Sequence, residues 1–359
     1  MFANPMFANP AYANPVYTSP VYANPVYANP TYADGYICDG VRPSTARPAS
    51  APARPWKGYG KKQKSGRSVV ILDTGIAARE FIEPGTGEKV DFCPRMLTAL
   101  SDAYPNRWEV PDNDKNAEPG EGFVDPVSGH GTFIAGIVQT LAPGTAILPL
   151  NIVTSYGDVD VLTVMKQVVE LCDNEELGPH TIVNMSFGGY ADEKMSTLQR
   201  AIRCIRDKKA VVVASAGNDA TDRPAFPACL PHVVGVGALD PYGPAPYSNF
   251  GAWVNACAPG TDLVSAFYRN FNGKTELPEL PGSSDPDKYE SWVRWTGTSF
   301  AAPVVTAALL REMRLTKCDA NTAVERVIDA PGLLRIAGLG TVVNLDLGDS
   351  TCLMPSGHS

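Results

Sequence analysis

The sequence predicts a three-layer α/β fold, with a mostly parallel central sheet and helices on both of its faces. Two observations support this prediction. Short runs of residues that are apolar at every position recur along the chain, which is typical of strands covered on both faces. Between these runs lie longer stretches with apolar residues at helical spacing. Alternation of this kind favours an open sheet that binds ligands beyond the carboxyl ends of its strands.

The expected strands are apolar runs, several of which end at glycine, asparagine or aspartate, residues that favour turns. In chain order they are SVVILDTGI (68–76), TAILPLNIV (145–153), HTIVNMSFGG (180–189), AVVVASAGND (210–219) and HVVGVGAL (232–239). A further short strand is expected near the C-terminus, at TVVNLDL (341–347).

The expected helices lie between and after these runs. Residues 193–208 place apolar side chains at helical spacing, which predicts an amphipathic helix. Those side chains are Met195, Leu198, Ile202 and Ile205. Other helices are expected at residues 159–173, VVTAALLREMRL (304–315) and NTAVERVIDA (321–330).

Composition divides the chain into segments. Residues 1–55 are expected to be a disordered, proline-rich segment that begins with five-residue repeats such as VYANP. These repeats place a proline at every fifth position and hold too little apolar surface to bury a core. The other segments are a basic linker (56–67), the folded domain (68–345) and a C-terminal tail (346–359).

Overall composition restricts the classes of function. The 359 residues carry a net charge of −8, which disfavours nucleic acid as a partner. No apolar run approaches the ~18 residues that span a membrane. Prolines interrupt the N-terminus and the first basic residue is Arg42, so no signal peptide is expected. We therefore expect a cytoplasmic protein, or one exported by an unrecognised route, whose eight cysteines are mostly free thiols.

Three motifs each place a reactive side chain within two residues of a glycine. In GTSFAAP, Ser299 precedes an apolar helix whose N-terminal N–H groups favour developing negative charge. In GHGT, His130 opens another helix. In DTG, Asp73 ends a strand, where a carboxylate can orient an imidazole.

Each of these motifs has another interpretation when it is taken alone. Ser299 could be only a helix N-cap, and His130 could be a structural histidine. Asp73 could be half of an aspartic-protease site, which needs two carboxylates. No second Asp-Thr-Gly or Asp-Ser-Gly occurs in the chain, although a homodimer could supply it.

A fourth motif, ASAGND (214–219), places Asn218 after a strand and Gly217. An amide side chain in this position can donate a hydrogen bond to a developing oxyanion. The alternative is that Gly217 and Asn218 form only a turn that ends the strand.

Together and in this order, the four motifs resemble the subtilase family of serine peptidases. The chain order Asp, His, Ser is that of subtilisin and differs from chymotrypsin and the α/β-hydrolases. The resemblance covers residues 68–345 and implies a subtilisin-like fold and a serine endopeptidase. It implies Ser299 as nucleophile, His130 as general base and acid, and Asp73 as the residue that orients His130. Asn218 and the Ser299 N–H would bind the oxyanion, while a peptide ligase or cyclase and an inactive binding scaffold are the alternatives.

The resemblance also implies a protein or peptide substrate bound as an extended strand. Ser186, Phe187 and Gly188 would form one edge of its site, and Gly217 would also contact it. Secreted subtilases usually carry a folded propeptide, which the repeat cannot be because it has no core. We hypothesise that the repeat recruits a partner or acts as an intramolecular pseudo-substrate.

This chemistry requires no cofactor, but many subtilases bind Ca²⁺. Asp112, Asp114 and Asn116 alternate as at the start of an EF-hand loop. The glycine expected sixth is Ala117, and the acidic residue expected twelfth is Phe123. A solvated acidic loop is therefore favoured over a calcium site.

Overall fold

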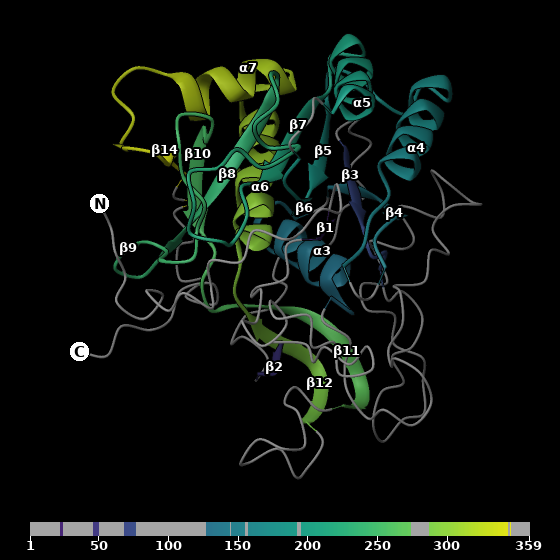
Figure 1. The fold of residues 1–359 in the computed structure, drawn as a ribbon, viewed down its shortest axis with the longest axis vertical. Coiled ribbons are helices and arrows are strands. Elements are labelled where there is room, and N and C mark those ends of the chain that lie inside the picture. The colour runs from purple at the N-terminus through teal and green to yellow at the C-terminus, as the bar shows by residue number, and fades with distance from the viewer. Residues whose placement is uncertain are drawn as a thin grey trace.

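A parallel sheet forms the centre of the protein (Figure 1). The computed structural model describes residues 22–23, 46–49, 68–76, 127–143, 145–154, 157–191, 195–273, 287–343 and 345. Within these ranges the sheet has nine strands in the order β13-β14-β10-β8-β7-β5-β3-β4, with β9 paired to β8. Among them only β9 and β13 pair antiparallel, so the predicted mostly parallel sheet is confirmed.

Six strands of this sheet lie in the apolar runs expected from the sequence, whereas β9, β10 and β13 were not expected. The strands are β3 (Ser68–Asp73), β4 (Ala146–Asn151), β5 (Thr181–Met185), β7 (Val211–Ser215), β8 (Val233–Asp240), β9 (Gly243–Pro244), β10 (Ala256–Pro259), β13 (Arg335–Ile336) and β14 (Gly340–Val342). The helices are α3 (His130–Leu141), α4 (Val161–Asp173), α5 (Ser196–Asp207), α6 (Thr298–Thr316) and α7 (Ala320–Val324). The last expected helix is thus a short α-helix, which continues as a π-helical turn, η2 (Glu325–Asp329).

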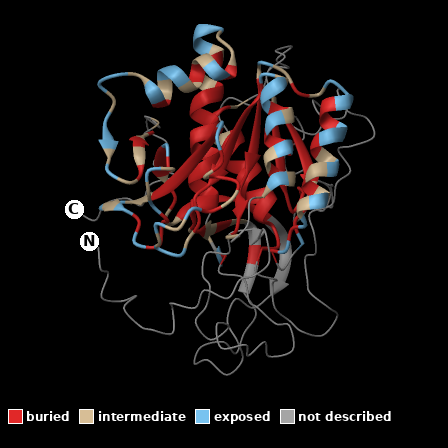
Figure 2. Cartoon of the chain, turned by 45° about the horizontal axis from the view of Figure 1, so that its top comes forward, coloured by how far each residue is buried: buried red, intermediate tan, exposed pale blue. Residues whose placement is uncertain are grey.

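Alternate residues of each strand face opposite layers of helices. In β3, Val69 and Ile71 pack with α3 and α6, whereas Val70 and Leu72 pack with α4 and α5. Figure 2 shows the strands buried between helices that expose one side to solvent. The three-layer architecture predicted from the sequence is therefore confirmed.

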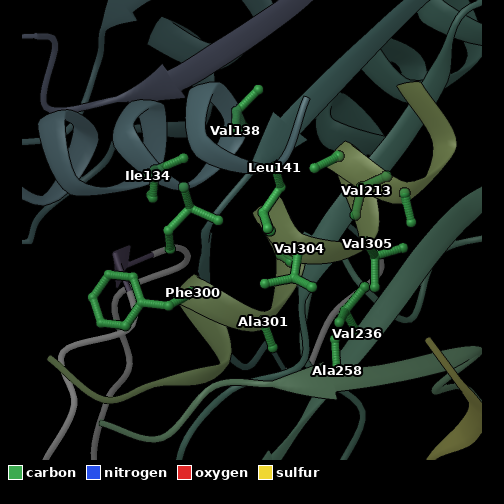
Figure 3. Packing of buried hydrophobic residues seen from close by; sticks show 14 of the residues in the cluster. Ile134, Val138, Leu141, Val213, Val236, Ala258, Phe300, Ala301, Val304 and Val305 are labelled. Atoms are coloured by element: carbon green, nitrogen blue, oxygen red, sulfur yellow. The ribbon is translucent and has the colours of Figure 1, made fainter. Parts of the chain in front are cut away.

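The helix α6 runs through the largest of the hydrophobic core clusters that the described residues form. All its residues from Thr298 to Leu310 are buried. Figure 3 shows Val304 of this helix below Leu141 of α3, and Val305 beside Val213 and Val236 of the sheet. Because its first turns are enclosed on every side, the position of the N-terminus of α6 is set by the core itself.

The order of the strands reverses at β3, which has β4 on one side and β5 on the other. The helix α3 connects β3 to β4 and packs on one face of the sheet, while α4 leads to β5 on the opposite face. In open sheets such a reversal leaves a crevice at the carboxyl ends of the strands, where ligands bind. Asp73 lies at this point.

Two short strands come from the N-terminal segment that the sequence predicts to be disordered. The strand β1 (Tyr22–Ala23) pairs antiparallel with β6 (Phe187–Gly188). The strand β2 (Arg47–Pro48) pairs with β12 (Asp287–Trp295), which itself pairs with β11 (Leu263–Gly273). Residues 22–23 and 46–49 of this segment are thus described in contact with the folded domain, and the expected division of the chain stays a prediction. The rest of segment 1–55, the linker 56–67 and the tail 346–359 lie outside the described residues.

Two of the described cysteines form a disulfide, which the sequence did not predict. Cys172 of α4 is bonded to Cys204 of α5, and these two helices pack side by side. Cys229, Cys257 and Cys318 are free within the described ranges, as expected. Burial raises the pKa of Cys229 to about 11 and that of Cys257 to about 12, so both stay protonated at neutral pH.

Candidate active site

Asp73 and His130 are hydrogen-bonded at the carboxyl edge of the sheet. Asp73 ends β3, and His130 begins α3. The His130 Nδ1 and Asp73 Oδ1 atoms lie 2.8 Å apart, and the Thr74 N–H donates to the same oxygen at 2.8 Å. Both side chains are buried, with 0% of Asp73 and 1% of His130 exposed. Because an ionised carboxylate only accepts, Nδ1 carries the proton of the neutral ring and Nε2 keeps a lone pair.

Close backbone packing holds this pair in place. The Gly131 N–H donates to Thr74 Oγ1 at 3.0 Å, which joins the end of β3 to the first turn of α3. Gly131 lies so close to β3 that a Cβ atom there would overlap the carbonyl oxygen of Gly75. Thr74 and the two glycines therefore set the distance between Asp73 and His130, a role that the sequence did not reveal for Thr74.

Ser299 lies in the first turn of α6. Its Oγ donates to the Ser186 carbonyl at 3.2 Å, and Ser186 Oγ donates to the Ser299 carbonyl at 2.8 Å. Both side chains are fully buried. These two hydrogen bonds join the chain after β5 to the N-terminus of α6, where the helix dipole favours negative charge.

A buried pair that the sequence did not predict extends this connection. Asn184 of β5 donates through Nδ2 to Ser186 Oγ at 2.9 Å. Thr306, two turns into α6, donates through Oγ1 to Asn184 Oδ1 at 3.0 Å. Both residues are polar positions within otherwise apolar segments, which is the signal that could have revealed them.

The His130 ring packs against the start of α6. Its centroid lies 5.2 Å from the ring of Phe300 and 5.6 Å from the ring of Trp295. Phe300 directly follows Ser299, so this contact brings the helix N-terminus to the ring. His130 Nε2 is buried and has no hydrogen-bond partner within the described part of the chain. A buried lone pair in this position can accept a proton from a nearby hydroxyl.

Asn218 and Gly217 follow β7 and contact the same helix N-terminus. Asn218 Oδ1 accepts from the Thr298 N–H and from Thr298 Oγ1, both at 2.9 Å. The Gly217 N–H in turn donates to Thr298 Oγ1 at 3.1 Å. These bonds settle which end of the amide is the oxygen, and they direct Asn218 Nδ2, a donor, away from Thr298.

Asn249 supports the turn that carries Asn218. Its Nδ2 donates to the Ala216 carbonyl at 2.9 Å and to Tyr190 Oη at 2.7 Å. A Cβ atom at Gly217 would overlap the Asn249 amide, and φ of Gly217 is 108°, so glycine is required here twice over. Burial and the neighbouring Asp219 carboxylate raise the pKa of Tyr190, which donates to that carboxylate at 2.6 Å.

The predicted substrate-binding segment, Ser186 to Gly188, lies at the same edge of the sheet. Its three residues are buried. The Phe187 side chain is part of the core between β5 and α5, so this residue offers a ligand only its backbone. That backbone pairs antiparallel with β1, which demonstrates that this edge accepts a strand.

The described residues provide no evident metal site. They include no group of three or more His, Cys, Asp or Glu side chains that could hold a metal ion. The calcium candidate at residues 112–116 lies outside the described ranges. We also find, among the helices that the structure describes, none with the length and hydropathy to cross a membrane.

The fold and site define a three-layer α/β protein that places a serine, a histidine and an aspartate at one sheet edge, and comparison with known proteins identifies its family. The profile of the subtilase family matches residues 64–328. The chain is 27% identical over 295 residues to the thermophilic serine proteinase of Bacillus sp. (strain AK1), covering 78% of this chain and 59% of that protein. It is 28% identical over 270 residues to an extracellular protease of Xanthomonas campestris pv. campestris, covering 69% of this chain and 44% of that protein. The crystal structure of a cold adapted subtilisin-like serine proteinase matches with a TM-score of 0.53 at 18% identity, covering 82% of this chain and 98% of that one.

This chain therefore belongs to the subtilase family. The recognition made from the four motifs is confirmed, and so is the subtilisin-like fold. The chain spans about half the length of the two relatives named above, at 59% and 44%.

Proposed function

We propose that this chain is a serine endopeptidase that cleaves proteins or peptides through an acyl-enzyme. One observation carries the proposal. His130 is hydrogen-bonded to Asp73 through Nδ1. Its other nitrogen is buried, has no hydrogen-bond partner among the described residues, and belongs to a ring that packs against the helix start carrying Ser299. Membership of the subtilase family supports the same chemistry.

In this mechanism Ser299 Oγ turns from the Ser186 carbonyl towards His130 and attacks the scissile carbonyl. His130 Nε2 accepts the Oγ proton, and Asp73 stabilises the resulting imidazolium through Nδ1. The C–N bond then breaks, and the leaving amine takes the proton from Nε2. Water attacks the acyl-enzyme in the second half, with His130 again as base, and this step releases the acid and restores Ser299.

Two donors would stabilise the oxyanion that forms in each half of the reaction. They are Asn218 Nδ2 and the Ser299 N–H. The two Thr298 hydrogen bonds to Asn218 Oδ1 hold the amide before substrate arrives. Donors that are already oriented need no rearrangement during the reaction, which is why they contribute strongly to the rate.

Labelling with a fluorophosphonate tests the nucleophile. The wild-type chain should be labelled, whereas Ser299→Ala and His130→Ala should not. Ser265→Ala is the matched control, because Ser265 is also a buried serine but donates to the Phe133 carbonyl in the core. A wild-type chain that resists labelling would refute the proposal and favour a binding scaffold. Mass spectrometry of the products would reveal joined peptides if the chain were instead a ligase or cyclase.

We further propose that the protein acts outside the cytoplasm, rather than in the cytoplasm as its N-terminus suggested. The Xanthomonas campestris relative is an extracellular protease, and the Cys172–Cys204 disulfide suits an oxidising compartment. To test this, the protein is isolated without a reducing agent, unfolded, alkylated and analysed by mass spectrometry. Both thiols alkylated in freshly isolated protein would contradict it.

The proposed mechanism uses protein groups alone and needs no cofactor. Calcium would then act only on stability, if it binds. A Ca²⁺ titration followed by melting temperature tests for such a site, because an ion that binds the folded chain must raise the melting temperature. Loss of hydrolysis in a chelator without any loss of stability would contradict the mechanism.

A further inference from the structure

Tyr190 comes two residues after the predicted substrate-binding segment, Ser186 to Gly188, and its hydroxyl reaches the turn that carries Asn218. Tyr190 Oη accepts from Asn249 Nδ2 at 2.7 Å and donates to Asp219 Oδ2 at 2.6 Å. Asp219 directly follows Asn218, the proposed oxyanion donor. One hydroxyl therefore joins the segment that would hold the substrate to the turn that would hold the oxyanion.

The Asn249 side chain holds both ends of this turn. Its Nδ2 donates to the Ala216 carbonyl at 2.9 Å. Its Oδ1 accepts from the Asp219 N–H at 3.0 Å and from the Thr221 N–H at 3.2 Å. Together with the Tyr190 hydroxyl, these groups occupy all four hydrogen-bonding positions of the Asn249 amide. Because Asn249 is fully buried, bulk water does not replace a partner that is lost.

The Tyr190 hydroxyl keeps its proton and acts as a donor. Burial and the neighbouring Asp219 carboxylate raise the pKa of Tyr190, so the phenol is neutral at the pH of any ordinary assay. Desolvation raises the pKa of Asp219, and the hydrogen bond from Tyr190 acts against this rise and favours the carboxylate. The hydrogen bonds therefore run in one direction, from Asn249 through Tyr190 to Asp219, and bonds in such a chain strengthen one another.

The turn around Asn218 depends on hydrogen bonds for its position. Gly217 has no side chain that could pack against the core, and its carbonyl accepts from the Asn249 N–H at 2.9 Å. The Asn218 side chain is held at its oxygen by Thr298. The direction of Nδ2 therefore depends on Thr298 at one end and on the backbone of the turn at the other.

The proposed reaction is sensitive to small movements of this turn. An oxyanion donor is effective when it lies about 2.7–3.1 Å from the oxygen that becomes charged. A shift of the Asn218 backbone by a fraction of that distance weakens the hydrogen bond to the oxyanion and leaves the fold intact. Residues that hold the turn can therefore affect the rate without touching the substrate.

We propose that Tyr190 is a positioning residue for the oxyanion donor, and that through Asn249 and Asp219 it fixes the turn from which Asn218 Nδ2 would reach the oxyanion. The proposal rests on the peptidase function proposed above. It assigns to the Tyr190 hydroxyl an effect on the transition state, and it requires no contact between this hydroxyl and the reacting atoms.

The substitution Tyr190→Phe tests the proposal. It removes the hydroxyl and keeps the ring, over which the Arg223 guanidinium carbon lies 4.7 Å from the centroid. With a fluorogenic peptide, kcat and kcat/KM should fall by the same factor, on the order of tenfold, because only the transition state loses an interaction. The melting temperature should fall by no more than about 2–4 °C. Tyr247→Phe is the matched control, because it removes another hydroxyl, 2.9 Å from Thr261 Oγ1, and should change neither kinetic constant.

A double-mutant cycle with Asn218→Ala shows whether Tyr190 acts through Asn218. Without the donor the hydroxyl has nothing to position, so Tyr190→Phe should cause no further loss of kcat in the Asn218→Ala chain. A merely structural role would give the same fractional loss in both backgrounds, and that result would overturn the inference. Wild-type kcat in Tyr190→Phe would overturn it as well.

The wild-type chain distinguishes failure of this inference from failure of the proposed function. A wild type that hydrolyses the peptide and is labelled by a fluorophosphonate leaves the peptidase function standing, whatever the outcome of the cycle. A wild type that is neither active nor labelled would overturn both proposals.

Discussion

Asn218 combines two roles that a pair of substitutions can separate. Its Oδ1 accepts two hydrogen bonds from Thr298, at 2.9 Å each, and its Nδ2 is the proposed oxyanion donor. The substitution Asn218→Ala removes both roles. The substitution Asn218→Asp keeps an oxygen that can accept from Thr298 and removes the donor. The free energy of unfolding should therefore depend on the Oδ1 acceptor, whereas kcat should depend on the Nδ2 donor.

The expected magnitudes differ enough to be told apart. Losing two hydrogen bonds of about 1 kcal/mol each should lower the free energy of unfolding of Asn218→Ala by about 2 kcal/mol. Asn218→Asp should retain most of that stability. Loss of the oxyanion-hole asparagine lowers kcat by about 10²–10³ in subtilisin, a member of the same family, so both variants should fall by at least this range. The aspartate should be the slower of the two, because its charge repels the oxyanion.

Two assays test this reasoning. Denaturant titration in a Ser299→Ala background gives the free energy of unfolding without self-digestion, and a fluorogenic peptide gives kcat with Ser299 present. Wild-type kcat in Asn218→Asp would refute the role of the donor. Equal losses of stability in the alanine and aspartate variants would refute the role of the acceptor.

Three other substitutions test the surroundings of the site and the end of the fold. Gly131→Ala should lower both the melting temperature and kcat, because its Cβ would overlap the carbonyl of Gly75, two residues after β3. Gly178→Ala, whose Cβ meets nothing within 4 Å, is the control and should change neither. Thr306→Val should cost about 1–3 kcal/mol in denaturant titration, since it leaves the buried Asn184 Oδ1 without its donor, whereas Thr306→Ser should cost much less. Asp319 caps α7, and the hydrogen bond that its carboxylate accepts from the Thr322 N–H lowers the pKa of Asp319. The cap therefore stabilises the fold fully above the unfolded pKa of about 3.9, and this stabilisation is lost as the pH falls through the lower folded pKa. Asp319→Ala should therefore cost about 1 kcal/mol at neutral pH and nothing in strong acid, and a cost that does not change with pH would contradict the capping role.

Much of the central sheet could be predicted because its signal is local. The run that forms β3 is apolar at successive positions because both faces of that strand are covered. This pattern is visible in the run itself, without knowledge of its contacts with residues far away in the sequence. The hairpin of β11 and β12 gave no such signal. It is held by contacts with segments far away in the chain, such as the Tyr289 hydroxyl bonded to Ala46 and the Ser265 hydroxyl bonded to Phe133.

The candidate site divides in the same way. The motifs around Asp73, His130, Ser299 and Asn218 are short and contain glycines, which indicate tight turns. Each of these four residues could therefore be found from its neighbours in sequence. The supporting residues could not. Asn184 and Thr306 are 122 positions apart and meet only because β5 and α6 pack together. Their polarity is visible in the sequence, but the partner that satisfies each of them is not.

The burial of α6 has a consequence for how the protein loses activity. Residues Thr298 to Leu310 are enclosed in the core, so their amides can exchange with solvent deuterium only when the core itself opens. Ser299, the proposed nucleophile, therefore has no local route to disorder, because any motion that displaces its backbone must also break the packing of the core around α6. Exchange at the first turns of α6 should follow the global unfolding free energy, and heating should abolish catalysis at the temperature where the fold melts rather than below it.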